Sequence, residues 1–329
     1  MKVLVTGATG FIGANLVREL LRQDYQVKAL VRQHSNHKNI EGLNIDTAPG
    51  DLRDRQSLDS ALEDCEALFH VAASYKFWTR HPAEIYESNV GGTENILAAA
   101  LARGVKRVVY TSTESTIGIN KRVGLGTEEM DINPDALAGD YKKSKLQAEK
   151  LALKMYGDGL PVVIVNPTMP VGPFDIKPTP SGKLIVDFLN RKMPAYVNTG
   201  LNIIDVQDVA KGHIMALEKG RPGERYILGN RNLALKDIFI ILEGISGIKA
   251  PGIRIPIWFA LFIAHIDEFL SGSILKKPPK VPLAGVKTSR KFRHFDCSKA
   301  INELGLPQTP VEEAFIKATE WYKDNGYIN

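Results

Sequence analysis

The 329-residue chain has 44% hydrophobic and 24% charged residues, an ordinary globular composition that excludes the disordered, collagen-like and coiled-coil classes. At roughly 150 residues per domain, its length predicts two domains, or one large domain with an added lobe. Seven basic residues and no acidic one lie between residues 276 and 293, and removing these seven from 42 leaves 35 basic against 37 acidic residues. The net charge of +5 therefore comes from one stretch, and we expect no nucleic-acid partner, which would need a broader basic face.

Cysteine content and hydropathy indicate a cytoplasmic protein. Cys65 and Cys297 are too few for a disulfide framework or a four-ligand zinc site, although one bridge stays open. The seven histidines show no metal-ligand spacing, so no metal site is predicted. No apolar run reaches the roughly 18 residues of a membrane span, and the N-terminus MKVLVTGATG lacks the apolar stretch and cleavage site of a signal peptide.

Strand-like and helix-like segments alternate along the first half of the chain. Short β-branched or apolar runs predict strands over residues 2–6, 26–31, 43–50, 67–72, 107–111 and 161–165, and helical spacing predicts helices over 11–22, 56–62, 82–103 and 140–156. This alternation indicates an α/β fold with a doubly wound parallel sheet, the Rossmann arrangement, covered on both faces.

The second half of the chain is less regular. Prolines and glycines crowd residues 166–180, which predicts a loop, and residues 203–217 are expected to form a strand and helix that return to the main sheet. A late strand is expected over 225–228. We therefore predict a dinucleotide-binding domain over residues 1–166, with returning segments near 203–228, and a smaller C-terminal substrate lobe made mainly of residues 167–329.

A glycine-rich motif follows the first strand and opens the first helix. The residues that form it are Gly7, Thr9, Gly10, Phe11, Ile12 and Gly13. The first glycine permits a tight turn, the second lets the backbone approach a pyrophosphate, and the third lets helix and strand pack closely. The phosphates would then rest on free N–H groups at the positive end of the helix.

The end of the second predicted strand distinguishes the two nicotinamide dinucleotides. An Asp or Glu there binds the 2′-hydroxyl of NAD, whereas this chain has Arg32, with His34, His37 and Lys38 soon after. The donor fork of an arginine suits a phosphate. We therefore expect NADP to be preferred, with NAD as the alternative.

Two further strand ends are expected to contact the cofactor. Asp51 and Leu52 follow the third strand, where they would meet the adenine edge. Val71, Ala72 and Ala73 close the fourth strand, and the alanines are small enough to let the cofactor lie close.

Tyr141 and Lys145 stand four residues apart on a predicted helix and share one face. A neighbouring ammonium and an oxidised nicotinamide both favour the phenolate, so we expect a lowered Tyr141 pKa. The phenol can then exchange a proton with a substrate oxygen while a hydride moves to or from the adjacent carbon. Hydroxyls at the end of the fifth strand, Ser112 and Thr113, are candidates to polarise that oxygen. Asn89 is a candidate to anchor a helix or a water molecule near Lys145.

Motifs along the first two-thirds of the chain, to about Leu228, resemble the extended short-chain dehydrogenase/reductase family. They are TGATGFIG, the Asp51–Leu52 pair, HVAA, NVGGTENIL, TSTEST, YKKSK and NPTMPVGP. Within that family the chain is similar to the dihydroflavonol 4-reductase branch. The segments AEIYESNVGGTENIL and MPAYVNTGLNIIDVQDVAKGHIMALEKG are most similar to bacterial hopanoid-associated sugar epimerases.

The resemblance implies specific roles for several residues. It implies a Ser/Thr–Tyr–Lys triad in which Thr113 takes the place of the family's serine, with Ser112 beside it. It also implies that residues from the 167–170 segment line the nicotinamide and that one later serine touches the cofactor or substrate; these residues are Pro167, Thr168, Met169, Pro170 and Ser181. Relatives dimerise through two long helices, which correspond to residues 82–103 and 140–156.

The main hypothesis is an NADP-preferring oxidoreductase that interconverts a carbonyl and an alcohol on a small-molecule substrate. The enzymatic alternative is an NAD-dependent epimerase or dehydratase acting on a sugar or nucleotide-sugar, and the non-enzymatic alternative is a cofactor sensor or scaffold.

Residues 255–266 hold no charged side chain and precede the basic stretch. Two interpretations of segment 255–293 follow. It forms either a helix in the core or at a dimer interface, followed by a solvated loop, or a peripheral contact with an anionic membrane.

Overall fold

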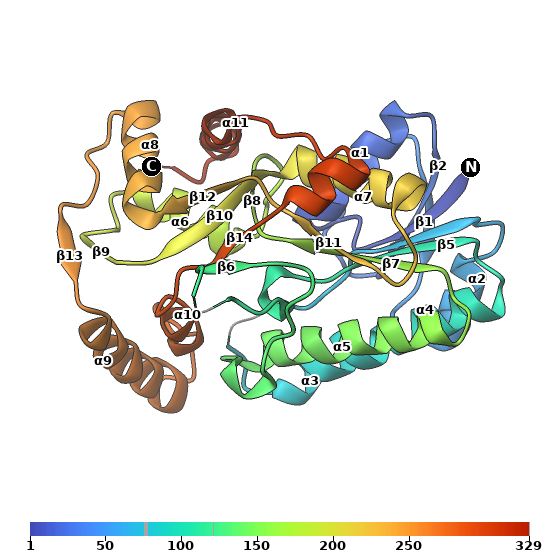
Figure 1. The fold of residues 1–329 in the computed structure, drawn as a ribbon, viewed down its shortest axis with the longest axis horizontal. Coiled ribbons are helices and arrows are strands. Elements are labelled where there is room, and N and C mark those ends of the chain that lie inside the picture. Colours follow the sequence, from blue (N-terminus) through green and yellow to red (C-terminus); the bar gives the residue numbers. More distant parts are fainter. Residues whose placement is uncertain (76–77, 121, 329) are drawn as a thin grey trace.

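The computed structural model describes residues 1–75, 78–120 and 122–328, and a seven-stranded sheet forms its centre (Figure 1). The strands lie in the order β11-β7-β5-β4-β1-β2-β3, and every neighbouring pair is parallel. Their bounds are β1 Lys2–Thr6, β2 Gln26–Val31, β3 Asp46–Pro49, β4 Ala67–His70, β5 Arg107–Thr111, β7 Val162–Pro167 and β11 Arg225–Leu228. The predicted doubly wound α/β fold is confirmed.

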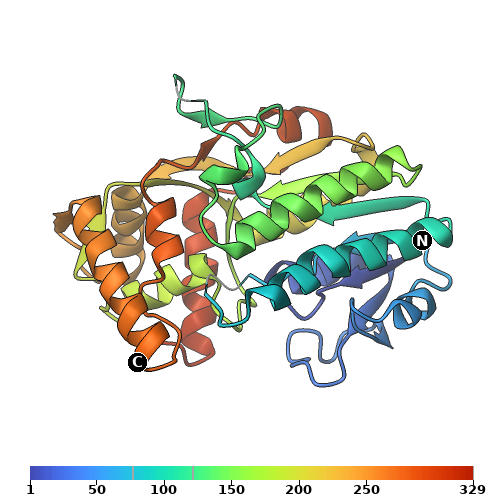
Figure 2. The same ribbon diagram turned by 90° about the horizontal axis from the view of Figure 1, so that it is seen from below.

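Alternate side chains of the strands feed two hydrophobic cores, one on each face of the sheet. In β1, Val3 and Val5 belong to one core and Leu4 to the other, because successive strand residues point to opposite faces. Helices α1 (Phe11–Arg22) and α7 (Val206–Lys219) pack together on the first face. The second face is covered by α2 (Arg55–Ala61), α4 (Gly92–Ala102) and α5 (Asp140–Gly157), and Figure 2 shows α4 and α5 side by side.

The helix predicted over residues 82–103 contains a change of pitch. It consists of α3 (Pro82–Tyr86), a π-helical segment over Glu87–Gly91, and then α4. Single π-helical turns inside α-helices are frequent at functional sites. This one carries Asn89, which is 1% exposed.

The predicted return of residues 203–217 to the main sheet is only half right. The strand β10 (Gly200–Asp205) lies in a separate three-stranded sheet, parallel to β8 (Met169–Val171) and antiparallel to β12 (Arg231–Ala234). Only α7 and the later strand β11 return to the main sheet. The segment 166–180 predicted as a loop supplies β8, and the pairing of β8 with β10 draws β10 away from the main sheet.

The C-terminal lobe has a hydrophobic core of its own. Helices α6 (Pro180–Leu189), α8 (Leu235–Ser246) and α11 (Val311–Asp324) pack around the three-stranded sheet. The last part of the chain does not stay in the lobe, because Ala300, Leu304 and Leu306 are buried in the α1–α7 core.

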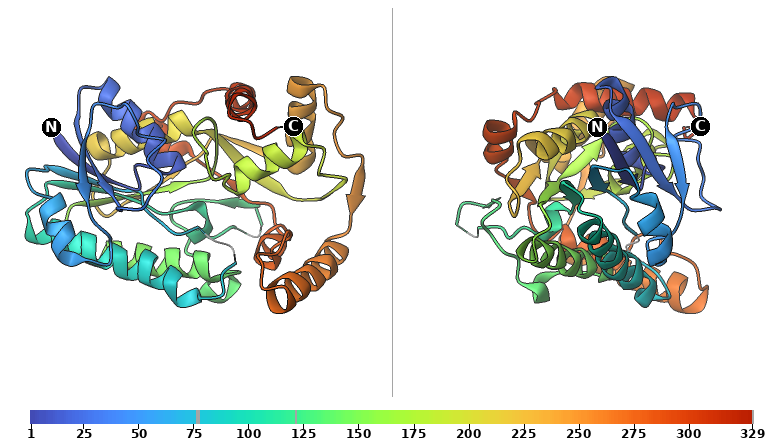
Figure 3. Two further views of the ribbon diagram at one scale, coloured as in Figure 1. Left: turned by 180° about the vertical axis from the view of Figure 1, so that it is seen from behind. Right: turned by 90° about the vertical axis from the view of Figure 1, so that its right-hand side faces the viewer.

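Short elements complete the lobe and its contacts with the main sheet. They are β6 Leu125–Gly126, β9 Ala195–Val197, β13 Ile253–Ile255, β14 His294–Phe295, the 3-10 turns Glu114–Thr116 and Pro134–Ala136, and the π-helical segment Ala300–Leu304. A helical hairpin forms one corner of the molecule (Figure 3). It consists of α9 (Ile257–Asp267), a π-helical continuation over Glu268–Ile274, and α10 (Leu283–Thr288).

Candidate active site

The glycine turn after β1 brings three backbone segments into close contact. Gly7 has a φ of +72°, and a Cβ on it would lie 2.7 Å from the backbone nitrogen of Ala72. A Cβ on Gly13 would lie 2.1 Å from the carbonyl oxygen of Gly7. Only glycine fits these two positions. Gly10 directly precedes α1, so the positive end of that helix lies at the turn, as a phosphate site requires.

The other residues of the motif support the turn from different sides. The Thr9 carbonyl accepts a hydrogen bond from Asn39 Nδ2 at 3.1 Å. Ile12 packs against the α1–α7 core, whereas Phe11 lines a small pocket with Pro170 and Ser181. The structure therefore brings Phe11 together with two residues of the lobe that the family resemblance implicates.

The end of β2 carries Arg32 with its side chain exposed. Its positive charge contributes to holding the pKa of Asp51 below its usual range, although the hydrogen bond from Arg53 is the larger cause. Arg53 makes a two-pronged contact with Asp51, with Nε to Oδ1 and Nη2 to Oδ2 both at 2.9 Å. Sequence reasoning missed Arg53, which adds a second guanidinium group to the region expected to bind a 2′-phosphate.

The loop after β4 lies against the glycine turn. The backbone of Val71 and Ala72 lies closest to the position that a Cβ on Gly7 would occupy. The Ala72 N–H donates a hydrogen bond to Thr6 Oγ1 at 3.2 Å. Ala73 follows directly and is half-buried. Leu52 packs against Gly92 of α4, so its side chain supports the sheet edge next to Asp51.

Lys145 is held at the end of β5 by two oxygens. Its side chain is 2% exposed, and Nζ donates to Tyr110 Oη and to the Thr111 carbonyl, both at 2.8 Å. Burial lowers the pKa of Lys145 to about 7, although the nearby carboxylate of Glu149 raises it. The ammonium is therefore positioned by the strand rather than by the tyrosine four residues before it.

Tyr141 lies at the start of α5, beside the same strand end. Burial, followed by the charge of Glu114, raises its pKa to about 12, and a hydrogen bond with Thr113 acts in the opposite direction. The expectation of a lowered pKa is wrong for the polypeptide alone, because burial and the charge of Glu114 outweigh the interactions that favour the phenolate. The phenol is consequently protonated at neutral pH, which is the form that can donate a proton.

The two hydroxyl candidates differ in their contacts. Thr113 is buried, and its Oγ1 accepts from the Ser115 N–H at 3.3 Å besides contacting Tyr141. Ser112 is 6% exposed, and its Oγ has no hydrogen-bond partner within residues 1–75, 78–120 and 122–328. A buried hydroxyl without a partner is costly unless it serves a ligand, so Ser112 Oγ is suited to bind one.

Asn89 links three parts of the site. Its Nδ2 lies 3.0 Å from Ser144 Oγ and 2.9 Å from the Ser74 carbonyl, and its Oδ1 accepts from the Ser74 N–H at 2.7 Å. Ser144 in turn donates to the Tyr141 carbonyl at 2.8 Å. The side chain of Asn89 thus ties the loop after β4 to the first turn of α5, where Tyr141 and Lys145 lie.

A buried polar network supports the β5 end from behind, and sequence reasoning missed it. Asn166 Nδ2 lies within 3.1 Å of the Thr113 carbonyl, Thr116 Oγ1 and Glu149 Oε2. The carboxylate of Glu149 also pairs with Arg225 at 3.3 Å. These partners lie up to 76 residues apart in the sequence, so no local sequence pattern predicts their contacts.

A second charged cluster reaches the site from the C-terminal lobe. Glu114 Oε2 accepts from Arg293 Nε at 2.9 Å, and Glu114 Oε1 accepts from Ser115 Oγ at 3.0 Å. The neighbouring Lys142 has its pKa lowered to about 8 by burial, and its Nζ donates to Thr288 Oγ1 at 2.6 Å. Arg293, the last residue of the basic stretch, is therefore a partner of the turn after β5 rather than a solvated charge.

The residues after β7 lead from the main sheet into the lobe. Pro167 ends β7, and Met169 and Pro170 lie in β8. The Thr168 hydroxyl donates to Asn202 Oδ1 at 2.9 Å, so the lobe sheet engages it. The Ser181 hydroxyl donates to the Pro170 carbonyl at 2.7 Å and so fixes the start of α6 beside this segment.

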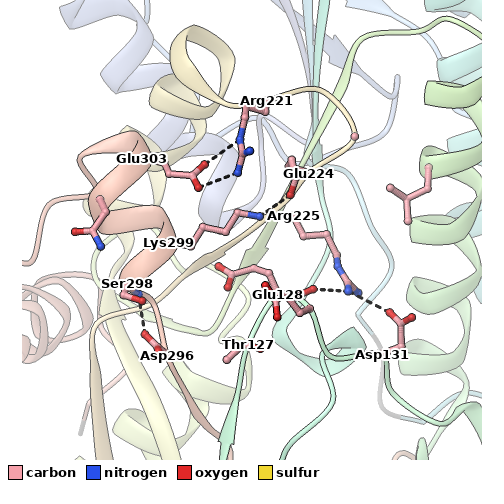
Figure 4. Close-up of a pocket in the computed structure, with 14 residues that line it drawn as sticks. Thr127, Glu128, Asp131, Arg221, Glu224, Arg225, Asp296, Ser298, Lys299 and Glu303 are labelled. Atoms are coloured by element: carbon pink, nitrogen blue, oxygen red, sulfur yellow. Dashed lines mark hydrogen bonds and ion pairs between the residues drawn. The ribbon is translucent and has the colours of Figure 1, made fainter.

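A separate polar groove of about 790 Å³ lies between β11 and the C-terminal segment (Figure 4). Three ion pairs join charged side chains of its lining: Arg221 with Glu303 at 2.8 Å, Lys299 with Glu224 at 2.7 Å, and Arg225 with Asp131 at 3.1 Å. Neither the glycine turn nor the tyrosine–lysine pair contributes to its lining. This groove is therefore not the candidate active site.

The residues at the carboxyl edge of the sheet fit a nicotinamide dinucleotide. The glycine turn packs its backbone too closely for a Cβ at Gly7 or Gly13, a helix end lies at that turn, and Ser112 Oγ is a buried hydroxyl without a partner among the described residues. In open α/β sheets, ligands bind at this edge. Fold and site together define a nucleotide-dependent oxidoreductase of the extended short-chain dehydrogenase/reductase class.

Comparisons with known proteins agree with this class. The model of the NAD dependent epimerase/dehydratase family matches residues 3–229. The chain is 47% identical over 329 residues to a Synechocystis protein provisionally named dihydroflavonol 4-reductase, covering 98% of this chain and 95% of the relative. It is 34% identical over 329 residues to sterol demethylase protein B of Methylococcus capsulatus, with full coverage of both. A solved nucleoside-diphosphate-sugar epimerase from Pseudomonas aeruginosa is 26% identical with a TM-score of 0.84, covering 100% of this chain and 99% of that one.

The chain belongs to the NAD dependent epimerase/dehydratase family. It is an NAD(P)-dependent enzyme of the oxidoreductase/epimerase type, and the predicted membership of the extended short-chain dehydrogenase/reductases is confirmed. Homologues act on small-molecule or sugar substrates.

Proposed function

We propose that this enzyme reduces a carbonyl group of an apolar small molecule to an alcohol. The observation that carries the proposal is the buried phenol of Tyr141, which is hydrogen-bonded to Thr113 at the end of β5, the strand whose last residues hold Lys145. Ser112 precedes Thr113 in the chain, and its buried hydroxyl has no partner among the described residues. Reduction requires one proton at the carbonyl oxygen, and a phenol with a pKa of about 12 holds that proton at neutral pH.

Each residue of the site has a separate task. Thr113 and Ser112 donate hydrogen bonds to the carbonyl oxygen and polarise it. Tyr141 gives its proton to that oxygen as charge develops there. Lys145, fixed by Tyr110 and Thr111, places a positive charge beside the strand end and is available to bind the ribose next to the nicotinamide. The bound dinucleotide supplies the hydride.

NADPH is the preferred cofactor in this proposal, because two guanidinium groups lie near the end of β2. Arg32 is exposed there, and Arg53 is held by Asp51 on the neighbouring loop. The carboxylate of Asp51 is itself occupied by Arg53, which reduces its capacity to accept from a ribose hydroxyl. A 2′-phosphate would satisfy both cations.

The names of two relatives support an apolar polycyclic ketone or alcohol as the substrate class. One is provisionally a reductase of dihydroflavonols and the other is a sterol demethylase protein. The alternative is epimerisation or dehydration of a sugar or nucleotide-sugar, favoured by the similarity to the Pseudomonas epimerase. Similarity to hopanoid-associated enzymes is compatible with either reaction.

The test is a comparison of the purified protein with Tyr141→Phe. The wild type should consume NADPH with an apolar cyclic ketone, whereas Tyr141→Phe should lose at least roughly a hundredfold in kcat, the typical contribution of a general acid, and keep its cofactor affinity. Tyr156→Phe is the matched control, because Tyr156 lies on the same helix and is 45% exposed. A fully active Tyr141→Phe enzyme contradicts the proposal, and NAD that survives dialysis with no net turnover of NADPH favours the epimerase.

Assembly and domain division are also proposals. We propose a homodimer through the helices over residues 82–103 and 140–156, to be checked by light scattering. We further propose a dinucleotide domain over residues 1–166 with 203–228, and a substrate lobe over 167–329 that carries specificity. Exchange of the lobe for that of a relative should change the substrate and leave the cofactor unchanged.

A further inference from the structure

The helical hairpin at the corner of the molecule presents its large apolar residues to the outside. Seven exposed apolar residues of α9 and the start of its π-helical continuation form what we call the docking face: Trp258, Phe259, Phe262, Ile263, Ile266, Phe269 and Leu270. Their exposed fractions range from 38% for Ile263 to 67% for Trp258. Residues spaced three and four apart lie on one side of a helix, so this set forms a continuous stripe.

The side of α9 that packs on the protein consists of small residues. Ala260 is 8% exposed and Ala264 is 0% exposed. A helix that belongs only to a water-exposed globular surface buries its large apolar side chains and exposes polar ones. The arrangement in α9 is the reverse, which indicates that its outer face meets an apolar environment.

Positive charges stand directly beside the docking face. Lys276, Lys277 and Lys280 follow the helix and are exposed. The acidic residues where α9 meets its continuation bind the loop that follows: Asp267 Oδ2 accepts from the Val281 N–H at 2.7 Å, and Glu268 Oε2 accepts from the Leu283 N–H at 3.0 Å. These two bonds fold the lysine-bearing loop back against the helix, so an apolar stripe and a cationic rim adjoin.

We propose that the docking face binds peripherally to an anionic lipid bilayer. The apolar stripe would enter the boundary between headgroups and acyl chains, where Trp and Phe are favourable, and the three lysines would contact anionic headgroups. No helix in the described part of the chain has both the length and the apolar content needed to cross a bilayer. The charge beside the stripe favours anionic lipid over a second copy of the chain, which carries the same lysines.

The hairpin also contacts two segments that lie next to the candidate active site in the chain. A Cβ on Gly272 would lie 3.3 Å from the indole of Trp78, in the loop after β4, and a Cβ on Gly139 would lie 3.1 Å from Ala284. Gly139 directly precedes α5, two residues before Tyr141. If the proposed function holds, an apolar substrate dissolved in the bilayer would enter the site next to the docking face.

Flotation through a density gradient tests the proposal with the full-length protein. We expect it to float with vesicles of phosphatidylcholine and phosphatidylglycerol at low salt, and to float less at high salt or with phosphatidylcholine alone. The triple variant Trp258→Ser/Phe262→Ser/Phe269→Ser should bind at least roughly tenfold more weakly, because it removes three exposed rings that would become buried in the bilayer. Ile316→Ser, which replaces an exposed apolar residue of α11, is the matched control.

A second variant, which replaces the lysines and leaves the helix unchanged, tests the proposal even if the apolar triple variant fails to fold. Lys276→Gln/Lys277→Gln/Lys280→Gln should also lose at least roughly tenfold in binding, because it removes three charges that would contact anionic headgroups, whereas Lys154→Gln/Lys236→Gln/Lys249→Gln should bind as the wild type does. Tyr141→Phe should float normally, which separates the failure of this proposal from the failure of the proposed function. Absence of flotation at low salt overturns the proposal. It is also overturned if sedimentation shows that the wild type is a dimer and the apolar triple variant a monomer, because the docking face would then be the dimer interface.

Discussion

Replacing Gly13 with alanine tests whether the glycine turn is built for a cofactor. The new Cβ would lie 2.1 Å from the Gly7 oxygen, 2.7 Å from the Gly7 carbonyl carbon and 3.0 Å from Ala8 Cα. All three atoms belong to the backbone, so no side chain can rotate away, and α1 must move from the turn until the shortest contact approaches 3 Å. Overpacking of this kind costs about 1–3 kcal/mol. The same movement shifts the helix end away from the pyrophosphate.

We therefore expect Gly13→Ala to lower the free energy of unfolding and to weaken NADPH binding by about 10-fold to 100-fold, since 1.4 kcal/mol corresponds to a factor of ten. Titration calorimetry with NADPH and urea unfolding measure the two effects. Gly91→Ala is the control, because a Cβ there meets nothing within 4 Å and the backbone is helical at φ −60°. Wild-type affinity in Gly13→Ala would refute the assignment of this turn as the phosphate site.

Three further predictions concern charge. The Lys145 pKa is about 7 in the folded protein and near 10.5 in the unfolded chain, so between these pH values the unfolded chain binds more protons. The free energy of unfolding of the wild type should therefore rise by about 5 kcal/mol from pH 7 to pH 10.5, relative to that of Lys145→Met. If urea unfolding shows the same difference in stability between the two proteins at every pH, the prediction is wrong. Arg32→Glu should move the ratio of kcat/KM for NADPH over NADH toward NADH by roughly a hundredfold, since it removes a charged phosphate contact and supplies a ribose acceptor; an unchanged ratio excludes Arg32 from the cofactor site. Glu114→Gln removes a charge that raises the Tyr141 pKa, so the loss of reductase activity with rising pH should begin at lower pH, and a profile that stays in place would show that Glu114 does not act on Tyr141.

Local spacing in the sequence determined much of the fold and part of the candidate site. The alternation of short apolar runs with helical segments predicted the main sheet, because strand and helix periodicities are properties of neighbouring residues. For the same reason the glycine turn, and the pair Tyr141 and Lys145 on one helix face, could be named without coordinates. The direction of the Tyr141 pKa could not, because it depends on how deeply the fold buries the phenol and on where it places Glu114.

The tertiary structure alone decided which distant segments meet. Arg293 reaches Glu114 across 179 residues, Glu149 and Arg225 pair across 76, and β10 joins the lobe sheet rather than the main one. The outward face of α9 likewise depends on what packs against Ala260 and Ala264. Sequence periodicity specifies which face of an element is apolar, but the path of the backbone between elements specifies whether that face meets the core, the cofactor edge or the surroundings of the protein.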